Sequence, residues 1–147
     1  MILYVMYIVA IILTVVSTVF YHLVLKQISP NAHPILLLSV AYIIAFLACI
    51  LSLIFFPIKN SLFYELKQIG FSSIILGIVT VGIELGFLFA YRTGWSISVT
   101  AMVSNIIVTL LLVITGKFFF KENLSLLQYF GILFSILGIS LIQFGKL

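Results

Sequence analysis

The stretch GIVTVGIELGFLFAYRTG, residues 77–94, consists almost entirely of apolar and small side chains and holds one acid, Glu84. An apolar run of about 20 residues is long enough to cross a bilayer as a helix. A carboxyl group inside such a helix is costly to keep, so an ionisable residue there is a functional candidate by default. Glu84 is therefore the first candidate for a binding residue.

The whole chain shares this apolar character. Of its 147 residues, 65% are hydrophobic and 7% are charged, whereas soluble domains have roughly 45–50% apolar and 25% charged residues. A soluble fold of this size cannot bury so much apolar surface, and every polar stretch is short. We predict an all-α, multi-pass protein of a prokaryotic plasma membrane, with one transmembrane domain over residues 1–147.

Five apolar segments are long enough to span a bilayer, and they cover residues 2–25, 34–57, 69–91, 95–116 and 126–145. Pro34 suits the first position of the second helix. Ser125 and Gln128 form a capping-box pattern before the fifth. Residues 58–68 are expected to form a small helix at the membrane interface.

Lysine and arginine are almost evenly divided between the two sides of this predicted topology. One side holds Lys59, Lys67, Lys117 and Lys121, and the other holds Lys26, Arg92 and Lys146. An excess of these residues on one side normally fixes the orientation of a membrane protein. The balance here permits insertion in both orientations.

Polar side chains fall on common faces of three of the predicted helices, because helix positions three, four or seven apart lie on one side. A cavity between helices is one interpretation of these faces. Hydroxyls bonded to their own helix, an interhelical bond from Asn105, and a structural pair of Glu84 with Lys26 or Arg92 are the alternatives. The candidate substrate- or proton-binding residues are Tyr7, Thr14, Ser17, Thr18, Tyr21, Thr80, Glu84, Tyr91 and Asn105.

Small residues form a second pattern. Gly82 and Gly86 make a GxxxG pair on the side of their helix opposite Glu84, and Gly131, Ser135 and Gly138 form a stripe on the last helix. Small residues let membrane helices approach closely. These five residues are expected at helix-packing or dimer interfaces.

The second half of the chain resembles the drug/metabolite transporter (DMT) superfamily in its EamA pattern, and the resemblance extends over essentially the whole sequence. Its marks within residues 82–142 are the Ala90–Tyr91 pair before a tight turn, a helix rich in small and hydroxyl residues, a loop with Glu122, and a helix with Gly131 and Gly138. Lys26 also matches a lysine often found at the end of the first helix. The chain looks like a single five-helix EamA-type unit related to the small multidrug resistance proteins.

The resemblance implies a dimer. Large members of the superfamily look like two inverted five-helix halves, and this chain has the size of one half. The partner would be an inverted copy of the same chain or a small homologue. Transporters built from inverted repeats place their sites near the midplane of the membrane.

One departure limits what the resemblance implies. Small multidrug resistance proteins carry an essential glutamate in their first helix, whereas LTVVSTVFYHLVLK, residues 13–26, contains no acid. Ser17 or Thr18 stands at roughly that place. The proton-coupled cation antiport of those proteins therefore cannot be assigned to this chain by matching residues. The candidate role of Glu84 is inferred from the energetic cost of an acid in an apolar helix and from its position in that helix.

Three functions stay open at this stage. The first is a transporter that moves a small metabolite or a cationic or amphipathic compound by alternating access, with proton coupling as an option. The second is a flippase for a substrate linked to a polyprenyl phosphate, such as an amino sugar. The third is an accessory subunit of a heteromeric transporter.

Enzymatic function is not expected. The sequence holds no nucleophile–base pair, metal motif or phosphate-binding loop, and its two histidines, His22 and His33, are too far apart to form a helical pair. A lone histidine in these helices is better interpreted as a packed, hydrogen-bonded group. We expect no cofactor, no bound metal and no nucleic-acid partner; the expected partners are a lipid bilayer, a small-molecule substrate and a second subunit.

Overall fold

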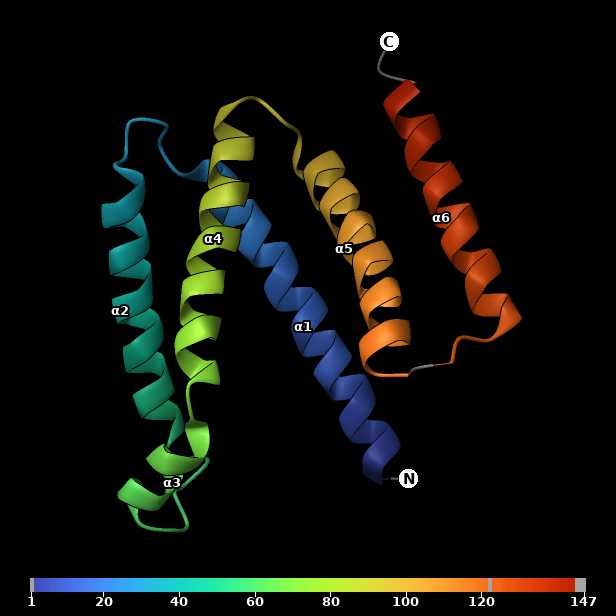
Figure 1. The fold of residues 1–147 in the computed structure, drawn as a ribbon. Coiled ribbons are helices and arrows are strands. Elements are labelled where there is room, and N and C mark those ends of the chain that lie inside the picture. Colours follow the sequence, from blue (N-terminus) through green and yellow to red (C-terminus); the bar gives the residue numbers. More distant parts are fainter. Residues whose placement is uncertain (1, 122, 145–147) are drawn as a thin grey trace. The chain divides into compact units, whose positions relative to one another are not determined.

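A computed structural model describes the backbone of residues 2–121 and 123–144, and the side chains of residues 4–121, 123–138, 140 and 141. All regular structure in these ranges is helical (Figure 1). The helices are α1 (Ile2–Gln27), α2 (Pro34–Ser52), α3 (Leu62–Ile69), α4 (Ser72–Arg92), α5 (Ile97–Phe119) and α6 (Leu126–Phe144). Glu122, Gly145 and Lys146, which the sequence-based predictions used, lie outside the described residues.

The chain divides into two compact units, which are described separately here. The N-terminal unit is Met1–Gly94 and contains α1 to α4; the C-terminal unit is Trp95–Leu147 and contains α5 and α6. In the first unit α4 contacts both α1 and α2, and in the second α5 contacts α6. The single transmembrane domain over residues 1–147 stays a prediction.

Four of the described helices are long and apolar enough to cross a membrane: Tyr4–Gln27, Pro34–Ser52, Ser72–Arg92 and Ile97–Phe119. In α6, the apolar stretch with described side chains is Leu126–Gly138, which is shorter than these four candidate spans. The protein is thus an all-α, multi-pass integral membrane protein. The count of five spanning helices stays a prediction.

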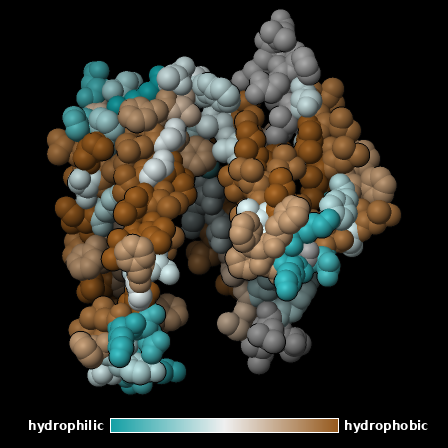
Figure 2. Space-filling model, in the orientation of Figure 1, coloured by the Kyte–Doolittle hydropathy of each residue, from teal (hydrophilic) through white to brown (hydrophobic). Residues whose placement is uncertain are grey.

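The surface agrees with a lipid environment. Large apolar side chains lie exposed along the spanning helices, as Leu13 at 66% and Phe46 at 63% illustrate. In the N-terminal unit, hydrophilic residues gather over the loop that follows α1 and around α3, and apolar residues cover the helix sides between them (Figure 2). Apolar sides with polar ends are the distribution that a bilayer selects.

The second helix is shorter than expected, because the prediction that it reaches Pro57 is wrong. It ends at Ser52, and the N–H groups of Leu53 and Ile54 donate to the carbonyls three residues before them. Proline disfavours the helical conformation in the residue before it and has no N–H of its own to donate. Pro57 therefore disfavours a helix that continues through it, and the chain has already left the helix in tight turns after Ser52.

The next spanning helix starts slightly later than residue 69, because α3 and a glycine turn precede it. The helix expected within residues 58–68 is present as α3, and Ser61 accepts a hydrogen bond from the Tyr64 N–H at its start. Gly70 then adopts a φ of 64°. This left-handed conformation favours glycine, and it turns the chain into α4.

Two local predictions at helix starts are confirmed. Pro34 occupies the first turn of α2. The Ser125 N–H donates to the side-chain oxygen of Gln128 at 2.7 Å, and the Gln128 N–H donates to the Ser125 hydroxyl at 3.4 Å. This reciprocal pair is the capping box expected before α6.

Most of the buried residues described in the N-terminal unit lie between α1 and α4. They are His22 and Leu25 on α1, and Leu88 and Tyr91 on α4; Leu38 on α2 is buried as well. Spacings of three residues place each pair on one helix face. This contact brings the C-terminal ends of both helices together and positions the side chains of the candidate site.

Candidate functional site

Four rings form a cluster between α1 and α4. The centroids of Tyr21 and Phe87 lie 4.9 and 4.8 Å from that of His22, and the Tyr91 ring stacks on Phe87 at 6.2 Å. Centroid separations of roughly 4.5–7 Å are favourable for aromatic pairs. The cluster therefore fixes the angle and register at which the two helices meet.

A hydrogen bond lies at the centre of this cluster. The Tyr91 hydroxyl and Nδ1 of His22 are 2.8 Å apart, and only 5% and 6% of the two side chains are exposed. A buried polar group that lacks a partner is expensive, so each of these two groups satisfies the other. His22 thus matches the expectation of a packed, hydrogen-bonded histidine.

Glu84 is partly buried on the same helix, two turns before Tyr91. Its carboxylate interacts electrostatically with the hydroxyls of Tyr21 on α1 and Tyr42 on α2. Both hydroxyl oxygens are buried, and neither has a hydrogen-bond partner at standard geometry. Glu84 and Tyr21 are close enough for a hydrogen bond to form after a small side-chain adjustment.

We call Glu84, Tyr21 and Tyr42 the carboxylate–tyrosine group. It joins three helices of the N-terminal unit, and it presents one acid and two phenols inside a mostly apolar assembly. A carboxylate can pair with a cation, and tyrosine faces attract cations. The group is therefore chemically suited to a cationic solute or a proton.

Of the predicted binding residues, the structure brings together Tyr21, Glu84 and Tyr91. The polar stripe on α1 lies exposed, and its members are Tyr7, Thr14, Ser17 and Thr18. The Thr14 hydroxyl donates to the Ala10 carbonyl at 2.9 Å. Thr14 thus follows the alternative interpretation, in which a hydroxyl bonds to a carbonyl of its own helix.

Two other predicted binding residues have surroundings of their own. Thr80 on α4 donates its hydroxyl to the Leu76 carbonyl at 2.8 Å. Asn105 is an exposed residue of α5, in the C-terminal unit. Their roles in binding stay predictions.

The small residues that were predicted to lie at helix-packing or dimer interfaces border open space in the structure. Gly82 and Gly86 are exposed, and a side chain added at either one would meet nothing within 4 Å. On α6, Gly131 is exposed and Gly138 is partly exposed, and a side chain added at either one would also meet nothing within 4 Å. The Ser135 hydroxyl donates to the Gly131 carbonyl at 2.9 Å. Their assignment to a dimer interface stays a prediction.

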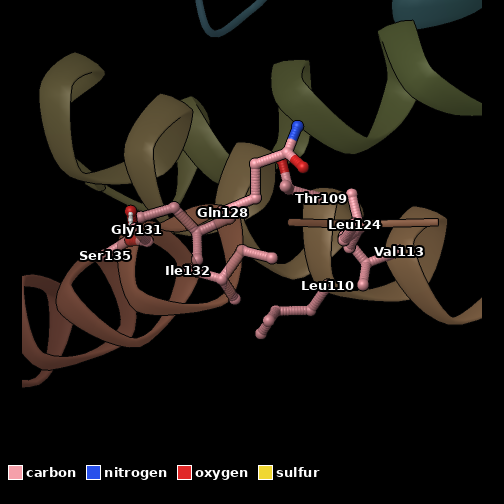
Figure 3. A pocket seen from close by; sticks show the side chains of 9 residues that line it. Thr109, Leu110, Val113, Leu124, Gln128, Gly131, Ile132 and Ser135 are labelled. Carbon is pink, nitrogen blue, oxygen red and sulfur yellow. Dashed lines mark hydrogen bonds between the residues drawn. The ribbon is translucent and has the colours of Figure 1, made fainter. Parts of the chain in front are cut away.

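Two pockets lie beside these elements, one in each unit. A cavity of about 440 Å³ opens between α5 and α6 (Figure 3). Its lining includes the polar residues Thr109 and Gln128 and the apolar residues Leu110 and Ile132. A smaller cavity of about 250 Å³ lies at the C-terminal ends of α1 and α4, with Lys26 and Arg92 in its wall.

The two basic residues of the smaller cavity bind backbone carbonyls. Lys26 donates to the Tyr91 carbonyl at 3.2 Å, and its ammonium lies 5.5 Å from the centre of the Tyr91 ring. Arg92 donates to the carbonyls of Ala32 at 2.6 Å and Ser29 at 3.4 Å. These bonds attach the loop between α1 and α2 to the end of α4.

The sequence-based list missed Tyr42 and Phe87. Phe87 precedes Tyr91 by one helical turn, so helical spacing from Tyr91 would have identified it. Tyr42 carries no such signal, because only the packing of α2 on α4 brings it near Glu84. Within the part of the chain that the structure describes, no three His, Cys, Asp or Glu side chains lie together to hold a metal.

Comparison with known protein families identifies the chain. The sequence model of the EamA-like transporter family matches residues 5–144. No curated protein and no solved structure matches. The match covers nearly the full length of the chain and includes three candidate membrane spans and all but the first residue of the other, Tyr4–Gln27. The chain belongs to the EamA-like transporter family.

Proposed function

We propose that this protein moves a small cationic or amphipathic compound across the membrane by alternating access. The observation that carries the proposal is the carboxylate–tyrosine group. Glu84 lies in a spanning helix, and its charge acts on the buried hydroxyls of Tyr21 and Tyr42, which belong to two other helices. Ionisable residues inside membrane-spanning segments are rare, and most of them have a function.

The chemistry of the group supports this substrate class. The Glu84 carboxylate would pair with the positive charge of a solute, and the phenol oxygens would accept hydrogen bonds from its N–H groups. The ring of Tyr21 and the neighbouring ring of Phe87 would cover apolar parts of the solute.

The active form in this proposal is a dimer. Among the described residues of the N-terminal unit, no side chain covers the exposed face of Gly82 and Gly86. This face allows another helix to approach α4 closely. The balanced distribution of basic residues supports an antiparallel homodimer, with a small homologue as the alternative partner.

The test uses the purified chain reconstituted in vesicles, with uptake of a panel of organic cations as the measurement. Glu84→Gln should abolish transport while dimer content and the melting temperature stay unchanged. The matched control is Glu65→Gln, which changes an acid of α3 outside the spanning helices and should leave transport intact.

Three outcomes contradict the proposal. Full transport by Glu84→Gln would remove the carboxylate from the mechanism. If the vesicles move only a lipid-linked amino sugar, the flippase alternative is favoured. If activity requires an added homologue, the chain is a subunit of a heteromeric transporter.

A further inference from the structure

The cavity at the ends of α1 and α4 has a chemistry that the proposed transport function does not use. The eight described residues that line it include two cations, Lys26 and Arg92, and no acid. They also include the apolar side chains of Leu25 and Leu88. The cavity is therefore cationic on one part of its wall and apolar on another.

Helix C-termini attract cations even without a ligand, because carbonyl groups there carry partial negative charge. Two features of Arg92 go beyond that role. Its Nη2 donates to carbonyls of a different segment, at Ala32 and Ser29, rather than to its own helix. Its Nε is buried and has no hydrogen-bond partner in the described structure. The guanidinium thus holds a donor that the protein itself does not satisfy.

The position of the cavity defines the kind of ligand it can meet. Lys26 and Arg92 lie in the last turns of two candidate membrane spans, so the cavity lies where a spanning helix reaches the lipid headgroups. Basic residues at this depth attract anionic headgroups. The volume of about 250 Å³ is below the roughly 300–1,000 Å³ of typical small-molecule sites. It suits a single charged group rather than a whole solute.

We propose that this cavity binds a phosphate group, from the headgroup of an anionic lipid or from a soluble phosphate ester. Arg92 would donate to the phosphate oxygens from Nε after a small side-chain rotation, since guanidinium geometry matches phosphate. Lys26 would add positive charge, and Leu25 and Leu88 would contact the first carbons beyond the phosphate. The inference stands independently of which compound the protein transports.

Binding is measured as the rise in melting temperature of the purified full chain in detergent. The probes are phosphatidylglycerol, phosphatidic acid, phosphatidylcholine and inorganic phosphate. We expect a saturable rise with the two anionic lipids and a much smaller one with phosphatidylcholine. A rise with inorganic phosphate as well identifies a soluble phosphate ester as a ligand; a rise with the anionic lipids alone identifies a headgroup.

The deciding variant is Gln27→Glu, which adds an acid to the cavity wall and keeps Arg92, whose guanidinium bonds the loop after α1. It should weaken phosphate binding by about tenfold or more, because like charges at this distance repel strongly. Gln27→Asn is the neutral control, and Lys67→Gln removes an exposed cation of α3. Both should bind as the wild type does.

Arg92→Gln should also abolish the response. If this variant does not fold, because Arg92 attaches the loop after α1, Gln27→Glu still decides the question. Unchanged binding by Gln27→Glu, or an equal response to phosphatidylcholine, would overturn the proposal.

Discussion

The Tyr91 hydroxyl and Nδ1 of His22 lie 2.8 Å apart, and they join α4 to α1 through two buried side chains. Seven residues before Tyr91, Glu84 on the same helix acts on the buried hydroxyls of Tyr21 and Tyr42. The helix α4 therefore carries a satisfied polar contact at Tyr91 and an acid at Glu84. The first stabilises the unit, and the second is available to a ligand.

Tyr91→Phe removes the hydroxyl that His22 bonds and leaves a buried ring nitrogen without a partner. We expect a loss of about 1–2 kcal/mol in the free energy of unfolding, the size of a hydrogen bond between membrane helices. The measurement is unfolding of the purified protein by sodium dodecyl sulfate in mixed micelles. Tyr4→Phe, at an exposed position of α1, is the control and should cost nothing measurable. Equal stability of the two variants would contradict a structural role for the bond.

Tyr42→Phe should behave in the opposite way. Its hydroxyl is buried without a hydrogen bond, so its removal relieves an unsatisfied group and leaves stability unchanged or slightly higher. Transport in vesicles should fall, because the solute loses a hydrogen-bond acceptor beside Glu84. A variant that transports normally would remove Tyr42 from the site, and one that loses stability would show that its hydroxyl has a structural partner.

Leu88→Ala should destabilise the contact between α1 and α4. Leu88 is 1% exposed, whereas Leu76 on the same helix is 68% exposed and provides the matched control. We expect a loss of about 2 kcal/mol, the low end of the range for buried leucines. Lipid is as apolar as leucine, so the loss reflects packing rather than transfer from water. The difference between Leu88→Ala and Leu76→Ala in detergent unfolding tests this prediction.

Gly82→Leu and Gly86→Leu test the dimer. Each side chain has open space within the chain, so neither variant should lower the stability of the monomer. Either one would block close approach of another helix to α4, and dimer content should fall in chemical crosslinking and sizing experiments. Gly77→Leu is the control, because Gly77 also has open space but lies outside the GxxxG pair. If all three variants dimerise equally, this face is not the dimer interface.

The composition and the apolar runs were sufficient to predict an all-α membrane protein, because lipid leaves helices as one of the few structures that satisfy every backbone group. The capping box at Ser125 and the small helix before α4 were also predictable, since they depend on neighbouring residues alone. The end of α2 was missed by five residues, because the chain turns well before Pro57. Of the nine candidate binding residues, the structure brings Glu84, Tyr21 and Tyr91 together, and their role in binding stays a prediction.

Sequence alone identified Glu84 as a candidate, since the cost of an acid in an apolar helix can be seen without coordinates. Only the tertiary structure placed Tyr42 near it, paired His22 with Tyr91, and left the Thr14 hydroxyl bonded to its own helix. Helical spacing defines which residues share a face, but it does not define which face meets a neighbour. That choice depends on the packing of several helices at once, and a single sequence does not display it.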